Sequence, residues 1–397
     1  MSVKIQSFTK DLQNALRVLE ARKESIRKAS PVPDPRDPVR ELADKLHPSS
    51  MEFVVESVRD SSPDTKTYRL KSADGHIPVF QAGQYLSLRL RIGESEVTRP
   101  YSLSSAPCEA LGEEGFVEIT VRRHEDAFVP AWLFENVRPG TQLQGNMPFG
   151  TFFWEPMRDS RNIVALAGGS GITPFVSMAR EIAFGKMKDA RITVLYGSVR
   201  ESDIILRTEL EEAERASDGR VKVVHVISDE PGWAGEKGFL SRELIEKYAG
   251  DDPTYLFCGS LPMFGSISGI MKEMGVTCRR FRHDAMNHPA DPERIEGWPS
   301  GNEKKDYQIT VVRGISETVI PASGAESIAV ALERAAIPVD THCRSGECGY
   351  CRAKLLEGEI FVPRFGDGRR QMDKDLGWFH ACSSYPLCDL KIKVNIL

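Results

Sequence analysis

The apolar residues of the first fifty positions recur with the spacing of a helix. From Phe8 to about Ala29 they fall every three or four residues, with lysine and glutamate on the opposite side. Four prolines between Pro31 and Pro38 end that helix, and a second short helix is expected over Val39–Leu46. The apolar face of the first helix consists of Phe8, Leu12, Leu16, Leu19 and Ile26. This face either packs on its own protein, forms a seam between two copies or docks a partner.

From Glu52 onward the pattern changes to short, half-alternating runs of the kind that form strands. Each run is bounded by Gly, Pro, Ser or Asp, which are typical turn residues. The expected strands are Glu52–Val58, Thr65–Leu70, Tyr85–Arg91, Phe116–Arg122 and Gln142–Gln144. A series of this kind predicts a small antiparallel β-barrel or sandwich.

Beyond about Arg161 apolar strands alternate with helical patterns. The run Asn162–Ala167 is continuously apolar, as expected of a buried parallel strand, and a helix pattern over Phe175–Phe184 follows it. The further pairs of strand and helix are Arg191–Tyr196 with Leu206–Ala216, Val221–Ile227 with Ser241–Tyr248, and Thr254–Cys258 with Phe264–Met274. Such units predict a doubly wound parallel sheet, whose ligands bind at the carboxyl ends of the strands. The segments expected at that edge are Gly168–Thr173, Tyr196–Ser198 and Cys258–Ser260.

The last part of the chain predicts a compact α+β module behind an exposed linker. Its expected elements are two strands in hairpin order, a helix and a final strand: Tyr307–Val312, Glu317–Ile320, Glu326–Ala336 and Leu390–Val394. The chain is therefore expected to be multidomain. The expected segments are an N-terminal helical extension (1–48), a β-barrel (49–157), an α/β nucleotide domain (158–286), a linker (287–305) and the α+β module (306–397).

Composition excludes several classes of protein. The chain has 397 residues with a formal net charge of -5 and no dense basic block, so nucleic-acid binding is not expected. No apolar run is long enough to span a bilayer, and the N-terminus lacks the apolar core of a signal peptide. We therefore expect a cytoplasmic protein without a membrane span. Eight cysteines in a chain of this length do not make a disulfide scaffold.

Four of those cysteines form the strongest motif of the sequence. Cys343, Cys348 and Cys351 have the spacing C-x4-C-x2-C, and Cys382 follows near the end of the chain. This is the plant-type [2Fe–2S] arrangement, in which thiolates hold both irons. Gly346 between them lets the loop wrap closely, so that backbone N–H groups can point at the sulfurs. The alternatives are a structural zinc site, which usually has two C-x2-C-like pairs, or ordinary buried cysteines.

Two further stretches indicate cofactors. Arg99-Pro100-Tyr101-Ser102 places a ring beside a hydroxyl and a guanidinium, which suits a flavin: the ring lies along the isoalloxazine and the arginine meets the pyrophosphate. A surface strand would explain these four residues equally well. Gly168–Pro174 is a glycine-rich turn between strand and helix, where phosphate can approach backbone N–H groups. It matches neither the G-x-G-x-x-G fingerprint nor the P-loop.

Taken together, these residues resemble the ferredoxin–NADP reductase superfamily with a C-terminal plant-type ferredoxin domain. The order of flavin, nicotinamide and cluster is similar to that in the reductases of phenylacetyl-CoA epoxidase, ketosteroid hydroxylase, hybrid-cluster protein and phthalate dioxygenase. The matching motifs, spread over residues 50 to 397, are Gly83–Tyr85, Arg99–Ser102, Ile119–Arg122, Gly168–Pro174, Cys258-Gly259 and the four cysteines. The implied fold is an antiparallel β-barrel flavin domain, an α/β doubly wound nucleotide domain and an α+β β-grasp ferredoxin domain.

The resemblance also implies roles for individual residues. Thr173 and Cys258 would flank the nicotinamide, and Asp284 would take the acidic role near the flavin in place of the family's glutamate. Pro130 replaces a serine that serves the cofactor pyrophosphate, which leaves FMN as the alternative to FAD. Residues implied to bind the flavin are Arg99, Pro100, Tyr101, Ser102, Thr120, Val121 and Arg122. Residues implied to bind the dinucleotide are Gly168, Gly169, Gly171, Thr173, Pro174, Ser198, Arg200, Cys258 and Gly259.

The function implied is that of an NAD(P)H:acceptor oxidoreductase. Electrons would pass from the nicotinamide through FAD and the [2Fe–2S] cluster, one at a time, to a partner such as an oxygenase, a haem protein or a corrinoid protein. NADH is expected rather than NADPH, because Arg200 stands beside two acids, Glu201 and Asp203, instead of in a basic cluster. The alternatives are electron flow from a reduced ferredoxin-type donor to NAD(P)+, and a non-catalytic relay subunit. A homodimer through the N-terminal helix is a further expectation.

Overall fold

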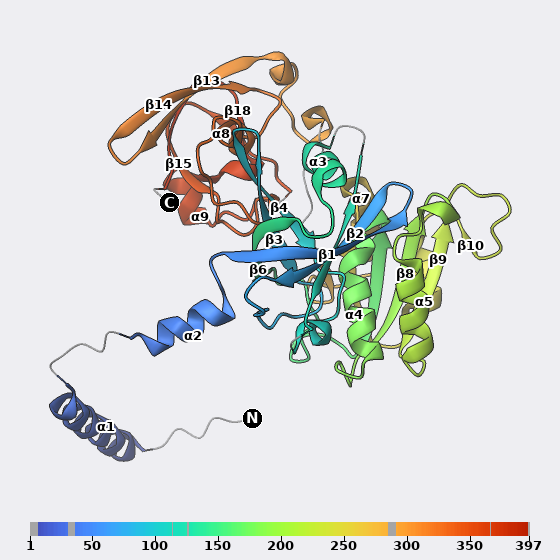
Figure 1. Ribbon diagram of the computed structural model, residues 1–397, viewed down its shortest axis with the longest axis horizontal. Coiled ribbons are helices and arrows are strands. Elements are labelled where there is room, and N and C mark those ends of the chain that lie inside the picture. The colour runs from blue at the N-terminus through green and yellow to red at the C-terminus, as the bar shows by residue number, and fades with distance from the viewer. Residues whose placement is uncertain are drawn as a thin grey trace. The chain divides into compact units, whose positions relative to one another are not determined.

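The structure is a computed structural model that describes residues 7–30, 36–112, 114–124, 127–284, 291–365 and 367–395. The chain divides into two compact units, Met1–Lys45 and Leu46–Leu397. Residues 31–35 of the proline connector, the start of the predicted linker at 287–290, and Ala285 and Met286 lie outside the described residues. Figure 1 shows the helices and strands coloured along the chain.

The N-terminal unit contains the two predicted helices. Helix α1 spans Phe8–Lys28 and helix α2 spans Pro38–Leu46. The carboxylate of Asp37 caps α2, because its Oδ1 accepts hydrogen bonds from the N–H groups of Val39 (3.1 Å) and Arg40 (3.0 Å). On α1 the predicted apolar face is at least half exposed at Leu12, Leu16, Leu19 and Ile26. The helices are as predicted, and the apolar face of α1 is exposed.

The first domain of the larger unit is a closed antiparallel barrel. Its strands are β1 (Met51–Ser62), β2 (Thr65–Ser72), β3 (Tyr85–Ile92), β4 (Ser95–Ser102), β5 (Val117–Arg122) and β6 (Gln142–Phe149). They are ordered β4-β3-β6-β1-β2-β5, and an antiparallel bridge between Leu103 and Ile119 joins the continuation of β4 to β5. Alternate residues of the strands point inward and fill the core, among them Phe53, Leu70, Leu86, Leu88 and Ile119. The barrel alternative of the sequence prediction is therefore confirmed.

Helix α3 (Phe128–Asn136) packs on this barrel and was not predicted from the sequence. Val129 and Leu133 from the helix are buried in the barrel core. The guanidinium of Arg138 closes the end of the helix by donating to the carbonyls of Phe134 (3.1 Å) and Glu135 (2.8 Å). Pro130 lies in the first turn of α3, where a missing N–H costs no helical hydrogen bond.

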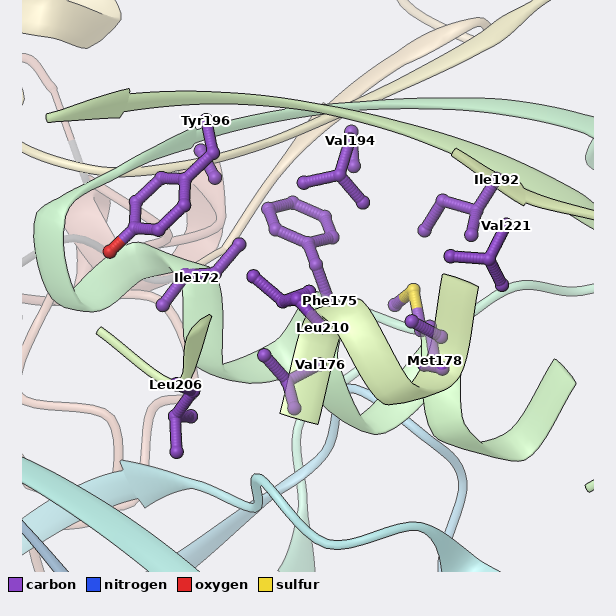
Figure 2. Close-up of a cluster of buried hydrophobic side chains, with 14 of the residues drawn as sticks. Ile172, Phe175, Val176, Met178, Ile192, Val194, Tyr196, Leu206, Leu210 and Val221 are labelled. Atoms are coloured by element: carbon purple, nitrogen blue, oxygen red, sulfur yellow. The ribbon is translucent and has the colours of Figure 1, made fainter. Parts of the chain in front are cut away.

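The second domain is the predicted parallel sheet with helices. Its strands are β7 (Asn162–Gly168), β8 (Arg191–Ser198), β9 (Val221–Ile227), β10 (Glu236–Lys237), β11 (Thr254–Cys258) and β12 (Phe281–His283). They run parallel in the order β10-β9-β8-β7-β11-β12. The helices are α4 (Thr173–Ala183), α5 (Arg207–Ala216), α6 (Arg242–Ala249) and α7 (Leu261–Glu273). Figure 2 shows how one face of β8 (Ile192, Val194, Tyr196) packs on Phe175 and Met178 of α4.

The register of this sheet brings three predicted ligand segments to one edge. Ala167 at the end of β7 pairs with Tyr196 of β8 on one side and with Cys258 of β11 on the other. Strand β12 continues the sheet beyond β11, with His283 paired to Phe257. The glycine turn, the end of β8 and the Cys258 segment therefore lie next to one another, as the sequence predicted.

The third domain is the predicted α+β module. Its larger sheet has the order β14-β13-β19-β15-β17, and a smaller sheet pairs β16 with β18. The strands are β13 (Asp306–Arg313), β14 (Ser316–Ser323), β15 (Arg352–Glu357), β16 (Ile360–Phe361), β17 (Trp378–His380), β18 (Tyr385–Pro386) and β19 (Leu390–Lys393). Helices α8 (Ile328–Arg334) and α9 (Gln371–Asp375) accompany them. The long loop between α8 and β15 carries the first three cysteines of the motif.

The described helices include none that is both long and apolar enough to cross a membrane.

Candidate cofactor sites

The glycine turn after β7 is shaped by the segment packed against it. A Cβ atom on Gly171 would lie 2.2 Å from the carbonyl oxygen of Cys258, so only glycine fits this position. Gly169 has a φ of +54°, and a Cβ on Gly168 would lie 2.4 Å from the sulfur of Met263. Thr173 begins α4 and donates from its hydroxyl to the carbonyl of Ser170 at 3.1 Å, with Pro174 next in the first turn. A tight turn into a helix N-terminus is suited to a phosphate group.

Tyr196 holds this turn in place, a role that the sequence analysis did not foresee. Its hydroxyl donates to the carbonyl of Gly169 at 3.0 Å and accepts from the N–H of Ile205 at 3.1 Å. The ring is fully buried between β8 and the helices, as Figure 2 shows. The phenol thus ties the glycine turn to the connection that leads into α5.

Three predicted residues from three strand ends meet at one carboxylate. Asp284 directly follows β12, and its Oδ2 accepts a hydrogen bond from the hydroxyl of Ser102 at the end of β4 (3.3 Å). The thiol of Cys258 at the end of β11 lies 3.8 Å from the same oxygen. Burial, and then the charge of Asp284, raises the pKa of the Cys258 thiol well above its usual range. The site therefore holds a neutral thiol beside a carboxylate where barrel and nucleotide domain meet.

The rest of β4 divides between the barrel and the third domain. Tyr101 packs against the barrel core, and burial raises the pKa of its phenol. The guanidinium of Arg99 donates to the carbonyl of Thr98 at 2.7 Å and lies 3.8 Å from a carboxylate oxygen of Glu333. Burial, and then the nearby Arg344, lowers the pKa of Arg99 to about 10. Pro100 lies between Arg99 and Tyr101 and is half-buried. That Arg99 meets the flavin pyrophosphate stays a prediction.

Strand β5 sends its predicted residues in different directions. Thr120 lies in the barrel, where its hydroxyl is 2.9 Å from that of Thr67, and Val121 is fully buried in the barrel core. Arg122 donates to Asp64 at 2.7 Å, and a Cβ on Gly169 would lie 3.1 Å from its Nη1. Arg122 therefore brings a positive charge from the barrel to the glycine turn of the nucleotide domain. Neither Asp64 nor this link was found from the sequence, since no local motif marks them.

The end of β8 and the loop after it carry two residues predicted to bind the dinucleotide, Ser198 and Arg200. Ser198 is buried at the end of the strand. The guanidinium of Arg200 lies 3.6 Å from the carboxylate of Asp229, which follows β9. On the other side of the glycine turn, a Cβ on Gly259 would lie 3.1 Å from the ring of Phe257. Arg200 thus already has an acidic partner.

The cysteine loop is shaped for a sulfur-bound cluster. Cys343, Cys351 and Cys382 are buried and Cys348 is exposed. The sulfurs of Cys351 and Cys382 lie 3.3 Å apart, and the sulfur of Cys343 accepts from the N–H of Cys348 at 3.4 Å. Another backbone donor to the same sulfur is Ser345 at 3.5 Å. Thiol donors with backbone N–H groups aimed at a sulfur fit a [2Fe–2S] cluster.

The backbone of this loop is held in an unusual conformation. Gly346 and Gly349 have positive φ angles of +83° and +78°, and so does Arg344 at +55°, which is uncommon for a residue with a side chain. A ring nitrogen of His380, just before Cys382, lies 2.5 Å from the carbonyl of Gly346. Among the described residues no group of three or more His, Cys, Asp or Glu side chains is arranged to hold a single metal ion.

A cavity of about 1170 Å³ joins the barrel to the cluster loop. Barrel residues such as Tyr85 and Phe149, the carboxylate of Asp284, and the thiols of Cys343 and Cys348 all line it. His342 connects the two sides, with its ring centroid 4.2 Å from that of Phe149. Of these residues only Tyr85, Asp284 and the cysteines were marked by a motif. The aromatic contact across the cavity carries no signal in the sequence.

Three known families of domain match the chain in order. The oxidoreductase FAD-binding domain matches residues 52–154, the oxidoreductase NAD-binding domain residues 165–268, and the 2Fe-2S iron-sulfur cluster binding domain residues 311–387. The first of these includes Pro130, so the missing serine does not remove the chain from the FAD-binding pattern.

The chain is also similar to named proteins and to a solved structure. The glycine betaine monooxygenase reductase subunit of Chromohalobacter salexigens is 27% identical over 344 residues, which covers 83% of this chain and 91% of that protein. NADH-cytochrome b5 reductase 1 of Dictyostelium discoideum is 31% identical and matches 49% of this chain and 66% of its own length. The structure of phthalate dioxygenase reductase shares the fold with a TM-score of 0.64 at 20% identity, covering 87% of this chain and 98% of that one.

Proposed function

The chain belongs to the family of reductases in which FAD-binding, NAD-binding and [2Fe–2S] domains follow one another, and we propose a function on this premise. The protein is the reductase component of an oxygenase system. It transfers electrons from a reduced nicotinamide to a partner protein. When bound, the nicotinamide would supply a hydride, which carries two electrons, and the flavin would accept both. The cluster would then carry the electrons one at a time. The oxygenase partner is inferred from the relatives that are named glycine betaine monooxygenase reductase subunits.

The cavity between barrel and cluster loop is the observation that carries this proposal. It is lined on one side by Tyr85 and Asp284 and on the other by Cys343 and Cys348. A flavin bound along β4 and a cluster bound by the loop would then lie at the two sides of one cavity. Electron transfer falls off steeply with distance, so this arrangement supports direct transfer between them.

The residues that meet at Asp284 are proposed to position the hydride transfer. Thr173 and Cys258 would flank the nicotinamide, and Ser102 and Asp284 would hold the polar edge of the flavin. The raised pKa of Cys258 keeps its thiol neutral, so it can contact a nicotinamide ring without adding charge. The chain's contribution is orientation and exclusion of water, because the cofactors supply the reactive groups.

NADH is proposed as the donor. A 2′-phosphate requires a free cationic group near the end of the second strand, and Arg200 is paired there with Asp229. Steady-state rates with both nucleotides test this. A tenfold or greater preference for NADPH would contradict it.

Anaerobic reduction of the purified protein tests the proposed function directly. NADH should bleach the flavin band first, and the EPR signal of a reduced [2Fe–2S] cluster should follow. The protein should then reduce an oxygenase that copurifies with it. Failure of NADH to reduce the cluster would overturn the proposal, and so would faster reduction of NAD+ by a reduced ferredoxin than of any acceptor by NADH.

The N-terminal helices are proposed to dock a second copy of the chain or the partner protein. The protein is proposed to be cytoplasmic, with the domain boundaries given in the sequence analysis. The exposed apolar face of α1 supports this, since such a face is stabilised when covered. Deleting residues 1–45 should leave ferricyanide turnover nearly intact and change the mass measured by light scattering or the affinity for the partner. A truncated protein with unchanged mass and unchanged partner affinity would refute this role.

A further inference from the structure

A buried carboxylate of the third domain lies between two arginines at the junction with the barrel. Glu333 on α8 is 5% exposed. It forms a two-pronged ion pair with Arg344 of the cysteine loop, with Oε1 contacting Nη1 and Oε2 lying 3.2 Å from Nη2. Its Oε2 is also 3.8 Å from Nη1 of Arg99 on β4 of the barrel. One carboxylate therefore contacts both the predicted flavin strand and the predicted cluster loop.

Neighbouring bonds reinforce the same junction. Arg99 donates to the carbonyl of Thr98 at 2.7 Å, and Nη1 of Arg344 lies 3.4 Å from that carbonyl. The hydroxyl of Thr98 donates to the backbone carbonyl of Thr341 at 2.7 Å, and the two threonine hydroxyls are also in contact. Thr341 precedes Cys343 by two residues. The bonds thus run without a break from the strand of Tyr101 and Ser102 to a cluster cysteine.

Electrostatics make the carboxylate indispensable to this arrangement. Arg99 and Arg344 are both largely buried, with side chains 25% and 10% exposed, and like charges at close range repel strongly where water is excluded. Glu333 contacts both guanidinium groups and compensates one of the two charges. Without the charge of Glu333, the repulsion between the two arginines could be relieved only if they moved apart or if water entered. Either change opens the junction between the barrel and the third domain.

We propose that Glu333 is a positioning residue that locks the cluster loop to the flavin strand and so sets the rate at which electrons pass between the two cofactors. The inference rests on the proposed function, because it presumes a flavin along β4 and a cluster in the loop. Glu333 is not itself among the residues predicted to bind the flavin or the cluster. It acts through Arg99 on one side and Arg344 on the other.

The substitution Glu333→Gln tests this, with Glu326→Gln as the matched control. Glutamine keeps the size of the side chain and removes only its charge. Glu326 lies near the start of the same helix, is 17% exposed and pairs with Arg334 within the third domain. Both proteins are compared with wild type at equal flavin and cluster content.

Two measurements test whether Glu333 holds the cluster loop to the flavin strand. Hydrogen exchange followed by mass spectrometry should show faster exchange in residues 95–102 and 338–350 of Glu333→Gln, and no change there in Glu326→Gln. Stopped-flow reduction by NADH should show cluster reduction slowed about tenfold or more relative to flavin reduction in Glu333→Gln, since small displacements of positioned groups cost one to two orders of magnitude. Arg344→Gln breaks the same ion pair from the loop and should give the same two changes, which keeps the test open if Glu333→Gln does not fold.

The outcomes separate this inference from the proposed function. If NADH reduces the cluster of the wild type and Glu333→Gln shows wild-type exchange and wild-type transfer, the inference is wrong and the proposed function stands. If NADH fails to reduce the wild-type cluster, the proposed function falls. Faster exchange in Glu333→Gln with an unchanged transfer rate would also overturn the inference, because the junction would then be structural only.

Discussion

The thiol of Cys258 and the hydroxyl of Ser102 share one oxygen of Asp284, and the thiol lies 3.8 Å from it. Cys258 and Asp284 come from adjacent parallel strands, whereas Ser102 comes from the barrel. The carboxylate therefore fixes the distance between the domain that binds the nicotinamide and the domain that binds the flavin. Hydride transfer requires those two rings in contact, so the proposed role of Asp284 is to hold the two domains in the alignment that this contact needs.

Asp284→Asn should lower the rate at which NADH bleaches the flavin by about tenfold to a hundredfold. A hydrogen bond to a charged group contributes roughly 1.5–3 kcal/mol, which corresponds to that range of rates. Stopped-flow absorbance of the flavin gives the rate, and Asp251→Asn, at an exposed loop residue, serves as the control. Asp284→Glu, which restores the family's longer side chain, should keep most of the activity. Wild-type bleaching in Asp284→Asn would remove Asp284 from the site.

The raised pKa of Cys258 predicts an unreactive thiol. Thiolates react with iodoacetamide and thiols do not, so Cys258 should be alkylated at pH 8 about a hundredfold more slowly than the exposed Cys278 of the same chain. Peptide mapping by mass spectrometry measures both. The folded protein holds the proton of the Cys258 thiol more tightly than the unfolded chain does. The stability that this difference contributes is therefore fully present below the ordinary thiol pKa and is lost as pH rises through the pKa of Cys258 in the folded protein. Equal labelling of the two cysteines in the native protein would contradict this.

Gly171→Ala should weaken nicotinamide binding and destabilise the nucleotide domain. The new methyl would lie 2.2 Å from the Cys258 carbonyl, and overpacking of this kind costs about 1–3 kcal/mol. Gly269→Ala, on α7 of the same domain, is the control, since no atom lies within 4 Å of the Cβ it would add. Urea unfolding and the KM for NADH separate the two variants. Indistinguishable behaviour would mean that the turn is free to move.

Cys348→Ser should abolish the cluster signals and spare flavin reduction. Ferricyanide, which accepts electrons from the flavin, should still be reduced, whereas cytochrome c served through the cluster should not. Cys388→Ser is the control, because the Cys388 sulfur lies against the N–H of Glu359 at 3.1 Å instead of in the cysteine loop. Loss of the EPR signal in Cys388→Ser together with its retention in Cys382→Ser would show that the ligand assignment is wrong by one cysteine.

Local patterns predicted the elements of this protein well where the period was clear. The four strand and helix pairs of the nucleotide domain appear within a few residues of their expected bounds, because continuous apolar runs and glycine turns mark them strongly. Strand β4 was not predicted as an element, because Arg99 and Pro100 interrupt its alternation of apolar and polar residues. Helix α3 was missed because its apolar residues point to no single face in the sequence.

The sites were predictable only where one segment carries the chemistry. The cysteine spacing and the glycine turn are contiguous and were found. The contacts of Asp284 with Ser102, or of Glu333 with Arg99, join residues more than 180 positions apart and depend on how whole domains pack. Arg99 illustrates the limit: its residue type suggested a phosphate contact, whereas its surroundings include a buried carboxylate of another domain.

The strand order β8-β7-β11-β12 places two strands between the end of β8 and the end of β12. We proposed that nucleotides are discriminated at the end of β8, near Arg200, and that the reacting rings are aligned at the end of β12, near Asp284. Three strand spacings lie between them, about 14–15 Å. A mutation that exchanges one coenzyme for another at β8 thus leaves the geometry at β12 untouched, so a lineage of such reductases can change its electron source without rebuilding its chemistry.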